Sequence, residues 1–287
     1  MTTSNPNSQA LEAKEHQGKP MAERWYLWIK EEQNRRLAWF VYEYDYFVFQ
    51  MYRTRPYLNI CDLTSDLPCY AAFWEAETPQ AWDTIQPWTI VPQSRPPSEL
   101  GSLLVGPLSV SHSRLNWTDK LQALLILLRR FCNIIDLTRG DWVGRLCHSY
   151  GSKDGIEEIL KAMDLLADVT SNDLKSALLS NEELVCKARA LQMVHMAHLH
   201  SAGRLMVLVK KICNLELNPD DAFEEILKWG NDNERKAREI AFHSAQILGI
   251  VRSHPLNSPS EMSNTFNSGI ALFFLSKRAA YRWIVFQ

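Results

Sequence analysis

Three histidines lie close together at His195, His198 and His200, in the spacing His-x-x-His-x-His. If this segment is helical, His195 and His198 share one face, because residues three apart are neighbours on a helix. Neutral imidazole is a common zinc ligand, so the pair could begin a metal site. Such a site needs further ligands and groups that orient the rings, and the segment has no His-Glu-x-x-His pattern. We therefore interpret it as a packed helix, with metal binding as the alternative.

A second group of candidate ligands is acidic and lies between positions 220 and 239: Asp220, Asp221, Glu224, Asn231, Asp232 and Glu239. All-α terpene synthases hold magnesium with an Asp-rich motif and an Asn/Ser/Glu motif on two helices far apart in sequence. Here the two groups are nearly adjacent, and Arg235 stands where a hydroxyl ligand belongs. A helix that begins at Asn218 and Pro219, with acids in its first turn, explains the same residues without a metal. A magnesium-dependent prenyl diphosphate enzyme remains only an alternative.

Other catalytic signatures are absent from the sequence. It has no Gly-rich phosphate loop, no Gly-x-Ser-x-Gly elbow and no zinc-binding Cys/His spacing. The six cysteines are dispersed, which is typical of reduced thiols in a cytosolic or nuclear protein. We therefore expect a chain that is not an enzyme and that binds no cofactor or metal.

The charge argues against direct contact with DNA. The chain has 31 basic and 33 acidic residues and a formal net charge of −2, whereas DNA-binding domains usually carry a basic excess. The pairs Arg129-Arg130 and Lys210-Lys211 are short, and they indicate solvated faces or weak nuclear-import signals. The longest apolar runs, 123–128 and 270–275, are too short to span a bilayer, so we expect no membrane partner.

Apolar residues recur at three- and four-residue steps over most of the chain, which predicts an all-α fold. Proline, glycine and capping residues place the helix ends. In the first half of the chain we expect helices at 22–52, 118–136 and 156–169, and a short one that starts at Thr78-Pro79 and carries Trp82. In the second half we expect a helix that starts at the capping box Ser180 to Glu183 and runs past His195, and another from Asn218-Pro219 to Gly230. The last two are expected at 232–253 and from about Ser263 to the end. Pro56 is expected to prevent the first helix from continuing.

Unlike residue types follow one another in a characteristic order in the first third of the chain. Residues 28–39 read WIKEEQNRRLAW, and Asp45, Arg55-Pro56, Asp62, Leu67-Pro68-Cys69, Trp74-Glu75-Ala76 and Trp82 come after them. This order resembles the fungal-specific transcription factor domain, also called the middle homology region, in the variant found with two-cysteine, two-histidine zinc fingers. Thr54 replaces the glycine that the family usually has before its Arg-Pro.

Packing favours a structural role for Glu32, Arg36 and Asp45, with ligand sensing or partner binding as the alternative. We interpret the whole family signature as structural: Trp28, Glu32, Arg35, Arg36, Asp45, Arg55, Pro56, Asp62, Leu67, Pro68, Trp74 and Trp82. Weaker similarity extends to the later helices of these proteins at Trp229, Arg238, Ala241, His243 and Arg252. The organisation that we expect is a disordered leader at 1–19, the C-terminal part of the family domain at 20–85, a Pro-rich linker at 86–102, and a helical C-terminal region at 103–287 that packs on it.

Spacing alone predicts an ion pair inside the signature. On a helix, Glu32 and Arg36 are four residues apart and lie on the apolar stripe of Trp25 and Ile29, so the pair is expected to be partly buried. Arg35 lies to the side, within reach of Glu31 or another helix. Asp45 lies on the opposite face, where it is expected to cap or pair with a neighbouring segment.

The resemblance implies a helical, regulatory and non-catalytic module in the nucleus. Its partners would be proteins, either the transcription machinery or related regulators, and a zinc finger outside this chain would bind the DNA. The alternative is a stand-alone helical interaction protein that competes for the partners of related regulators.

Overall fold

The computed structural model describes residues 18–52, 57–58, 63, 65–69, 71–85, 117–139, 152–168, 181–201, 211 and 218–285. These residues contain helices and no strand, so the predicted all-α fold class is confirmed. The chain divides into two compact units. Unit 1 comprises residues 1–45 and 58–100, and unit 2 comprises residues 46–57 and 101–287. The predicted leader lies outside the described residues except for its last two positions, and the predicted linker lies wholly outside them.

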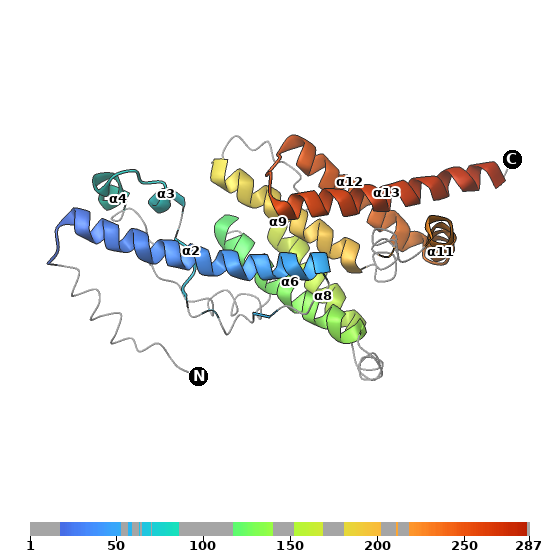
Figure 1. Ribbon diagram of the computed structural model, residues 1–287, viewed down its shortest axis with the longest axis horizontal. Coiled ribbons are helices and arrows are strands. Elements are labelled where there is room, and N and C mark those ends of the chain that lie inside the picture. Colours follow the sequence, from blue (N-terminus) through green and yellow to red (C-terminus); the bar gives the residue numbers. More distant parts are fainter. Residues whose placement is uncertain are drawn as a thin grey trace. The chain divides into compact units, whose positions relative to one another are not determined.

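Unit 1 is built on the long helix α2, Met21–Tyr52, whose last seven residues belong to unit 2. Two short helices follow within unit 1, α3 (Ala71–Trp74) and α4 (Pro79–Ile85), and Figure 1 shows both of them beside the first half of α2. Thr78 caps α4 as predicted, because its Oγ1 accepts a hydrogen bond of 3.1 Å from the backbone N–H of Ala81. Tryptophan and phenylalanine side chains fill the space between these helices.

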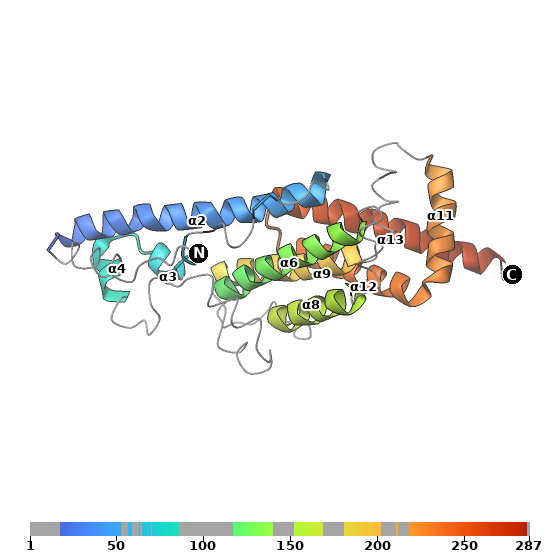
Figure 2. The ribbon, with the colours of Figure 1, turned by 90° about the horizontal axis from the view of Figure 1, so that it is seen from below.

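Unit 2 contains six described helices. They are α6 (Trp117–Arg139), α8 (Ser152–Ala167), α9 (Asn181–Ser201), α11 (Pro219–Asp232), α12 (Glu234–Ser253) and α13 (Pro259–Val285). Helix α9 packs against α6, α8 and α12, and α13 packs against α12 (Figure 2). This central position explains why α9 is mostly buried from Cys186 to His200, polar side chains included.

Several predicted helix ends are wrong. Helix α8 begins at Ser152 rather than at 156, and α6 continues to Arg139 rather than ending at 136. Gly230 was expected to stop α11, but it is buried inside the helix, which continues to Asp232. Asn233 ends it instead, because its side-chain Nδ2 donates to the Trp229 carbonyl at 2.9 Å and its backbone leaves the helical region. Helix α13 begins at Pro259 rather than near Ser263.

The earlier start of α13 has a local cause. Ser258 Oγ accepts a hydrogen bond from the N–H of Glu261 at 3.2 Å, and Pro259 occupies the first turn. The Glu261 carboxylate reaches back to the N–H groups of Leu256 and Asn257, at 2.8 to 3.0 Å. Ser258 and Glu261 therefore form a variant of the capping box, which the spacing Ser-x-x-Glu could have indicated. The capping box predicted at Ser180 lies outside the described residues.

Candidate functional site

The signature residues of α2 surround one buried carboxylate. Glu32 is 0% exposed, and its Oε1 accepts a hydrogen bond of 2.9 Å from Arg36 Nε. Its other oxygen, Oε2, accepts from Arg35 Nη1 at 3.4 Å. The second terminal nitrogen of Arg35, Nη2, lies 3.5 Å from the Glu31 carboxylate. The predicted Glu32–Arg36 pair is therefore present. The Glu32 side chain is fully buried, whereas that of Arg36 is 26% exposed.

The same pair binds the backbone of Cys69 from both sides. The Cys69 N–H donates to Glu32 Oε1 at 2.9 Å, and the Cys69 carbonyl accepts from Arg36 Nη2 at 3.3 Å. Leu67 and Pro68, which precede Cys69, are buried as well. A buried backbone segment outside a helix must find partners for its polar groups, and here two side chains supply them. We call Glu32, Arg36 and the Cys69 peptide groups the signature clamp.

Aromatic side chains close around the signature clamp. The Trp28 ring lies 5.5 Å from the ring of Trp82 and 6.4 Å from that of Phe73, measured between centroids. The Arg36 guanidinium lies over Trp74, 4.6 Å from its ring centroid, in the arrangement of a cation–π contact. Trp39 adds a further link, because its Nε1–H donates to the Asp66 carbonyl at 3.1 Å.

The signature clamp and its aromatic neighbours connect α2 with the segment at Leu67–Cys69 and with α3 and α4. All of these segments lie within the part of the chain that matches a known family. Residues 3–143 match the sequence model of the fungal specific transcription factor domain. These residues belong to that family. No curated protein and no solved structure matches the chain. The matched part of the transcription factor domain includes α2, α3, α4 and α6, and thus the whole signature clamp.

Asp45 of the transcription factor domain was expected to cap or pair with a neighbouring segment, and it makes such a contact. Its Oδ2 accepts a hydrogen bond of 2.9 Å from the backbone N–H of Leu58. Asp45 therefore binds the backbone at Leu58, after the end of α2, in the way that Glu32 binds the backbone at Cys69. The predicted signature residues Arg55, Pro56 and Asp62 lie outside the described residues.

Cys69 is the one thiol inside the signature clamp. Burial raises its pKa to about 12, and the neighbouring Glu32 carboxylate acts in the same direction, while Arg36 opposes them. Because the thiolate is the reactive form, this cysteine remains a thiol at neutral pH and is not a nucleophile. Its contribution to the domain comes through its backbone. The motif contains Cys69, but spacing alone did not indicate that its peptide groups are the partners of Glu32 and Arg36.

The histidines of α9 lie in unit 2, and other helices supply their partners. His198 Nε2 lies 2.9 Å from Asp164 Oδ1 on α8, and His195 Nδ1 lies 2.9 Å from His243 Nδ1 on α12. Over the described ranges, no group of three or more His, Cys, Asp or Glu side chains is arranged to hold a metal ion. His243 had been singled out only through the weaker resemblance, and Asp164 had not been singled out at all.

The acidic cluster of α11 is a solvent-exposed helix start. Asp220 and Asp221 are both exposed, and Asn218 Oδ1 accepts from the N–H of Asp220 at 3.1 Å, which is the predicted cap. Glu239, the distant member of the proposed magnesium set, instead pairs with Arg235 and Lys236 at 3.2 Å each. Capping at the start of α11 and ion pairs within α12 therefore account for the contacts of Asp220 and Glu239.

One of the two basic pairs differs from the solvated face that was expected, at its first residue. Arg129 is only 4% exposed, so Arg129-Arg130 is not a solvated basic face in the folded unit. In the second pair, Lys211 is exposed and Lys210 lies outside the described residues. No helix of the described part combines the length and the apolar character needed to cross a membrane.

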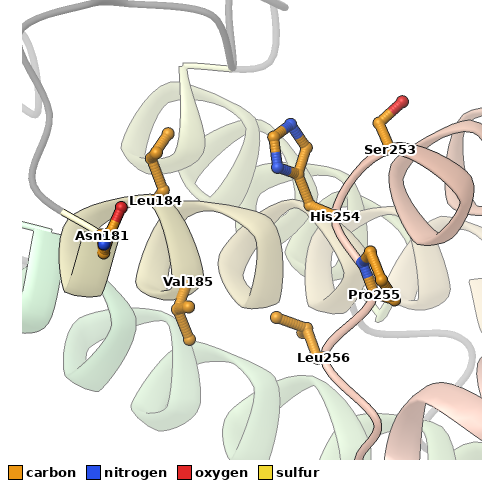
Figure 3. Close-up of a pocket in the computed structure, with 7 residues that line it drawn as sticks. All are labelled: Asn181, Leu184, Val185, Ser253, His254, Pro255 and Leu256. Atoms are coloured by element: carbon orange, nitrogen blue, oxygen red, sulfur yellow. The ribbon is translucent and has the colours of Figure 1, made fainter.

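A pocket of about 320 Å³ opens between the start of α9 and the end of α12. Its lining is mostly apolar: Asn181, Leu184, Val185, Ser253, His254, Pro255 and Leu256. Figure 3 shows the Ser253 hydroxyl pointing away from the His254 ring, so these two side chains do not form a nucleophile and base pair. The pocket offers a small surface depression with one imidazole, and it adds no catalytic group.

Proposed function

We propose that this chain is the regulatory module of a fungal transcription factor, that it acts in the nucleus, and that it acts without catalysis. The observation that carries the proposal is the match of residues 3–143 to the fungal specific transcription factor domain. The signature residues support a structural reading of that match, because Glu32, Arg36 and Trp28 are engaged in packing and in backbone hydrogen bonds. None of these three is positioned as a reacting group.

The partners that we propose are proteins of the transcription machinery, and DNA would be bound by a zinc finger outside this chain. The outer face of α2 supports contact with proteins. Leu37, Phe40, Val41 and Tyr44 follow one another at helical spacing and are 46% to 60% exposed. Phe40 and Tyr44 stack with their centroids 6.3 Å apart. Apolar side chains that gather on an exposed face are typical of interaction surfaces.

A transcription assay tests this proposal. The chain is fused to an unrelated DNA-binding domain, and a reporter gene with the matching promoter sites is measured in fungal cells. We expect reporter transcription to change severalfold compared with the DNA-binding domain alone. The double substitution Leu37→Asp and Phe40→Asp should abolish that change. Gln33→Asp and Asn34→Asp, which place the same charges on exposed positions of the same helix, should leave it in place. An unaltered reporter with a folded, nuclear fusion would overturn the proposal.

The second candidate function is a stand-alone competitor for the partners of related regulators. The same exposed face of α2 favours it, since this face would serve either role. The two functions differ in whether the chain needs a DNA-binding domain. A competitor would alter the transcription of a related factor's genes when it is expressed alone, whereas a regulatory module would act only in the fusion.

A further inference from the structure

Three imidazoles from two helices form one contact, which we call the histidine stack: His195 and His198 of α9, and His243 of α12. The rings of His198 and His243 lie parallel, with centroids 4.0 Å apart and an interplanar angle of 5°. The Nδ1 atoms of His195 and His243 are 2.9 Å apart. His195 is 0% exposed, so the contact is shielded from water. The Phe242 ring meets both His195 and His243 edge-on.

The short Nδ1 to Nδ1 distance limits how many protons the histidine stack can hold. A hydrogen bond between two ring nitrogens needs a proton on one Nδ1 and a bare lone pair on the other. If both rings became imidazolium, both Nδ1 atoms would carry protons and the bond would be lost. The buried Nε2 of His195 has no hydrogen-bond partner, which favours a tautomer of His195 that carries its proton on Nδ1 and donates to His243.

The third ring adds a second limit. His198 Nε2 lies 2.9 Å from the Asp164 carboxylate, so a positive charge on His198 would have a counter-charge beside it. A second positive charge on His243 would lie about 4 Å above it, at the stacking distance. Burial lowers the pKa of His195 to about 4 and that of His243 to about 2, with repulsion from His198 as the next cause in both.

Two other charges around the histidine stack act on its pKa values in opposite directions. Among the side chains that the structure describes, the buried and half-buried charged ones on α9 and on the helices packed against α9 and α12 are Glu183, Lys187 and Arg189 on α9, Asp119, Lys120 and Arg129 on α6, Asp164 on α8, Glu225 on α11, Lys236 and Glu239 on α12, and Glu261 on α13. Of these, Asp164 raises the pKa of His195, and Lys236 lowers that of His243. Burial remains the first cause for both rings.

We propose that the histidine stack is a proton-responsive lock between α9 and α12, closed while His195 and His243 are neutral and opened when they are protonated. For a histidine whose pKa is depressed by folding, the unfolded chain binds protons more readily than the folded chain. The stabilisation is therefore complete above about pH 6.5, where a free imidazole is neutral, and is lost progressively as the pH falls toward about 4. Helix α9 contacts α6 and α8 as well, so opening the lock loosens unit 2 as a whole.

Histidine titration on the unmodified full chain tests the proposal directly. The ring Hε1 resonances are followed by NMR between pH 8 and pH 4.5, and they are assigned with single substitutions. We expect His195 and His243 to stay neutral to below about pH 5 in the folded chain. If His195 and His243 titrate near pH 6.5 while the chain stays folded, the proposal is wrong.

Thermal melts test the consequence for stability. The double variant His195→Leu with His243→Phe removes both partners of the ring hydrogen bond together, so neither is left unpaired, and the phenyl ring can still stack on His198. Between pH 7.5 and pH 5, the unmodified chain should lose at least about 5 °C more in Tm than this variant.

The control is His254→Gln, which removes a half-buried imidazole beyond the end of α12 and should leave the pH dependence of Tm unchanged. An equal fall in Tm for the double variant and the unmodified chain would overturn the lock. Should the double variant fail to fold, the titration of the unmodified chain still decides the question.

Discussion

At the residue scale, the signature of this domain is a set of hydrogen bonds around one buried acid. The helical spacing of Glu32 and Arg36 correctly predicted their pairing, and Arg35 reaches Glu31 as expected. The sequence could not indicate that Glu32 also accepts from the backbone of Cys69, 37 residues farther along the chain. Periodicity reports which residues share a face, but it does not report which distant segment covers that face.

The first prediction concerns Arg36. Replacing it with alanine leaves the buried Glu32 carboxylate without its closest counter-charge and removes a donor to the Cys69 carbonyl. We expect Arg36→Ala to lower the free energy of unfolding by roughly 3–5 kcal/mol, as for other broken buried pairs. Urea unfolding followed by tryptophan fluorescence measures this, because Trp28, Trp74 and Trp82 lie around the signature clamp.

The matched control for Arg36 is Arg235. It pairs with Glu239 at the same four-residue spacing, with acid and base in the reverse order, and its side chain is 92% exposed. Exposed pairs contribute little, so Arg235→Ala should change the free energy of unfolding by no more than about 0.5 kcal/mol. Equal effects of the two substitutions would show that burial of Glu32 is not what makes the signature pair important.

At the element scale, the existence of every described helix except the short α3 followed from the sequence, and helix ends followed only in part. The pairs Thr78-Pro79 and Asn218-Pro219 correctly placed the starts of α4 and α11. Gly230 failed as a stop signal because α11 continues past it to Asp232, and Asn233 satisfies a terminal carbonyl there instead. The start of α13 was placed too late because the prediction followed the apolar run rather than the Ser258 cap.

The second prediction concerns the start of α13. Glu261 is buried, and its carboxylate accepts from two backbone N–H groups and from Gln192 Nε2 at 2.9 Å. Glu261→Ala should therefore lower the free energy of unfolding of unit 2 by about 2–3 kcal/mol, since it removes charge-assisted hydrogen bonds and leaves their donors buried. Thermal and urea unfolding followed by far-UV circular dichroism measures this. Glu224→Ala, which changes an exposed glutamate of α11, should have little effect.

The third prediction concerns the exposed acids of α11. Asp220→Ala and Asp221→Ala remove negative charge from the positive end of the helix, so together they should cost no more than about 1–2 kcal/mol of stability. Magnesium should not raise the Tm of the unmodified chain, and no prenyl diphosphate should be turned over with or without it. Magnesium-dependent turnover that disappears in these variants would instead support the enzyme alternative.

At the scale of the whole molecule, the family match and the division into units do not coincide. The match at residues 3–143 includes the helices described in unit 1 and also α6 of unit 2. Helix α6 packs on α8 and α9, which lie beyond the matched residues. Helix α6, which lies within the matched residues, is therefore buried in part by helices that lie beyond them. The domain boundaries expected from the sequence remain predictions.

The fourth prediction concerns DNA. The chain carries a net charge of −2, and a protein that neutralises many phosphates usually needs a basic surface. We expect the isolated chain to give no sequence-dependent shift of duplex DNA in a gel assay at about 0.15 M salt. A shift that survives added salt and depends on the DNA sequence would contradict this and would place a DNA-binding surface within the chain itself.

The sequence by itself determined the helical class, the family of the first half and the local pairs within a single helix, because these depend on residues a few positions apart. Tertiary structure alone decided that the Cys69 peptide groups bind the Glu32–Arg36 pair. It also decided that His243 is the hydrogen-bond partner of His195 and that Asp164 is the partner of His198. These contacts join segments tens of residues apart. Which buried polar group meets which partner depends on how the helices pack, and helical spacing carries no record of that packing.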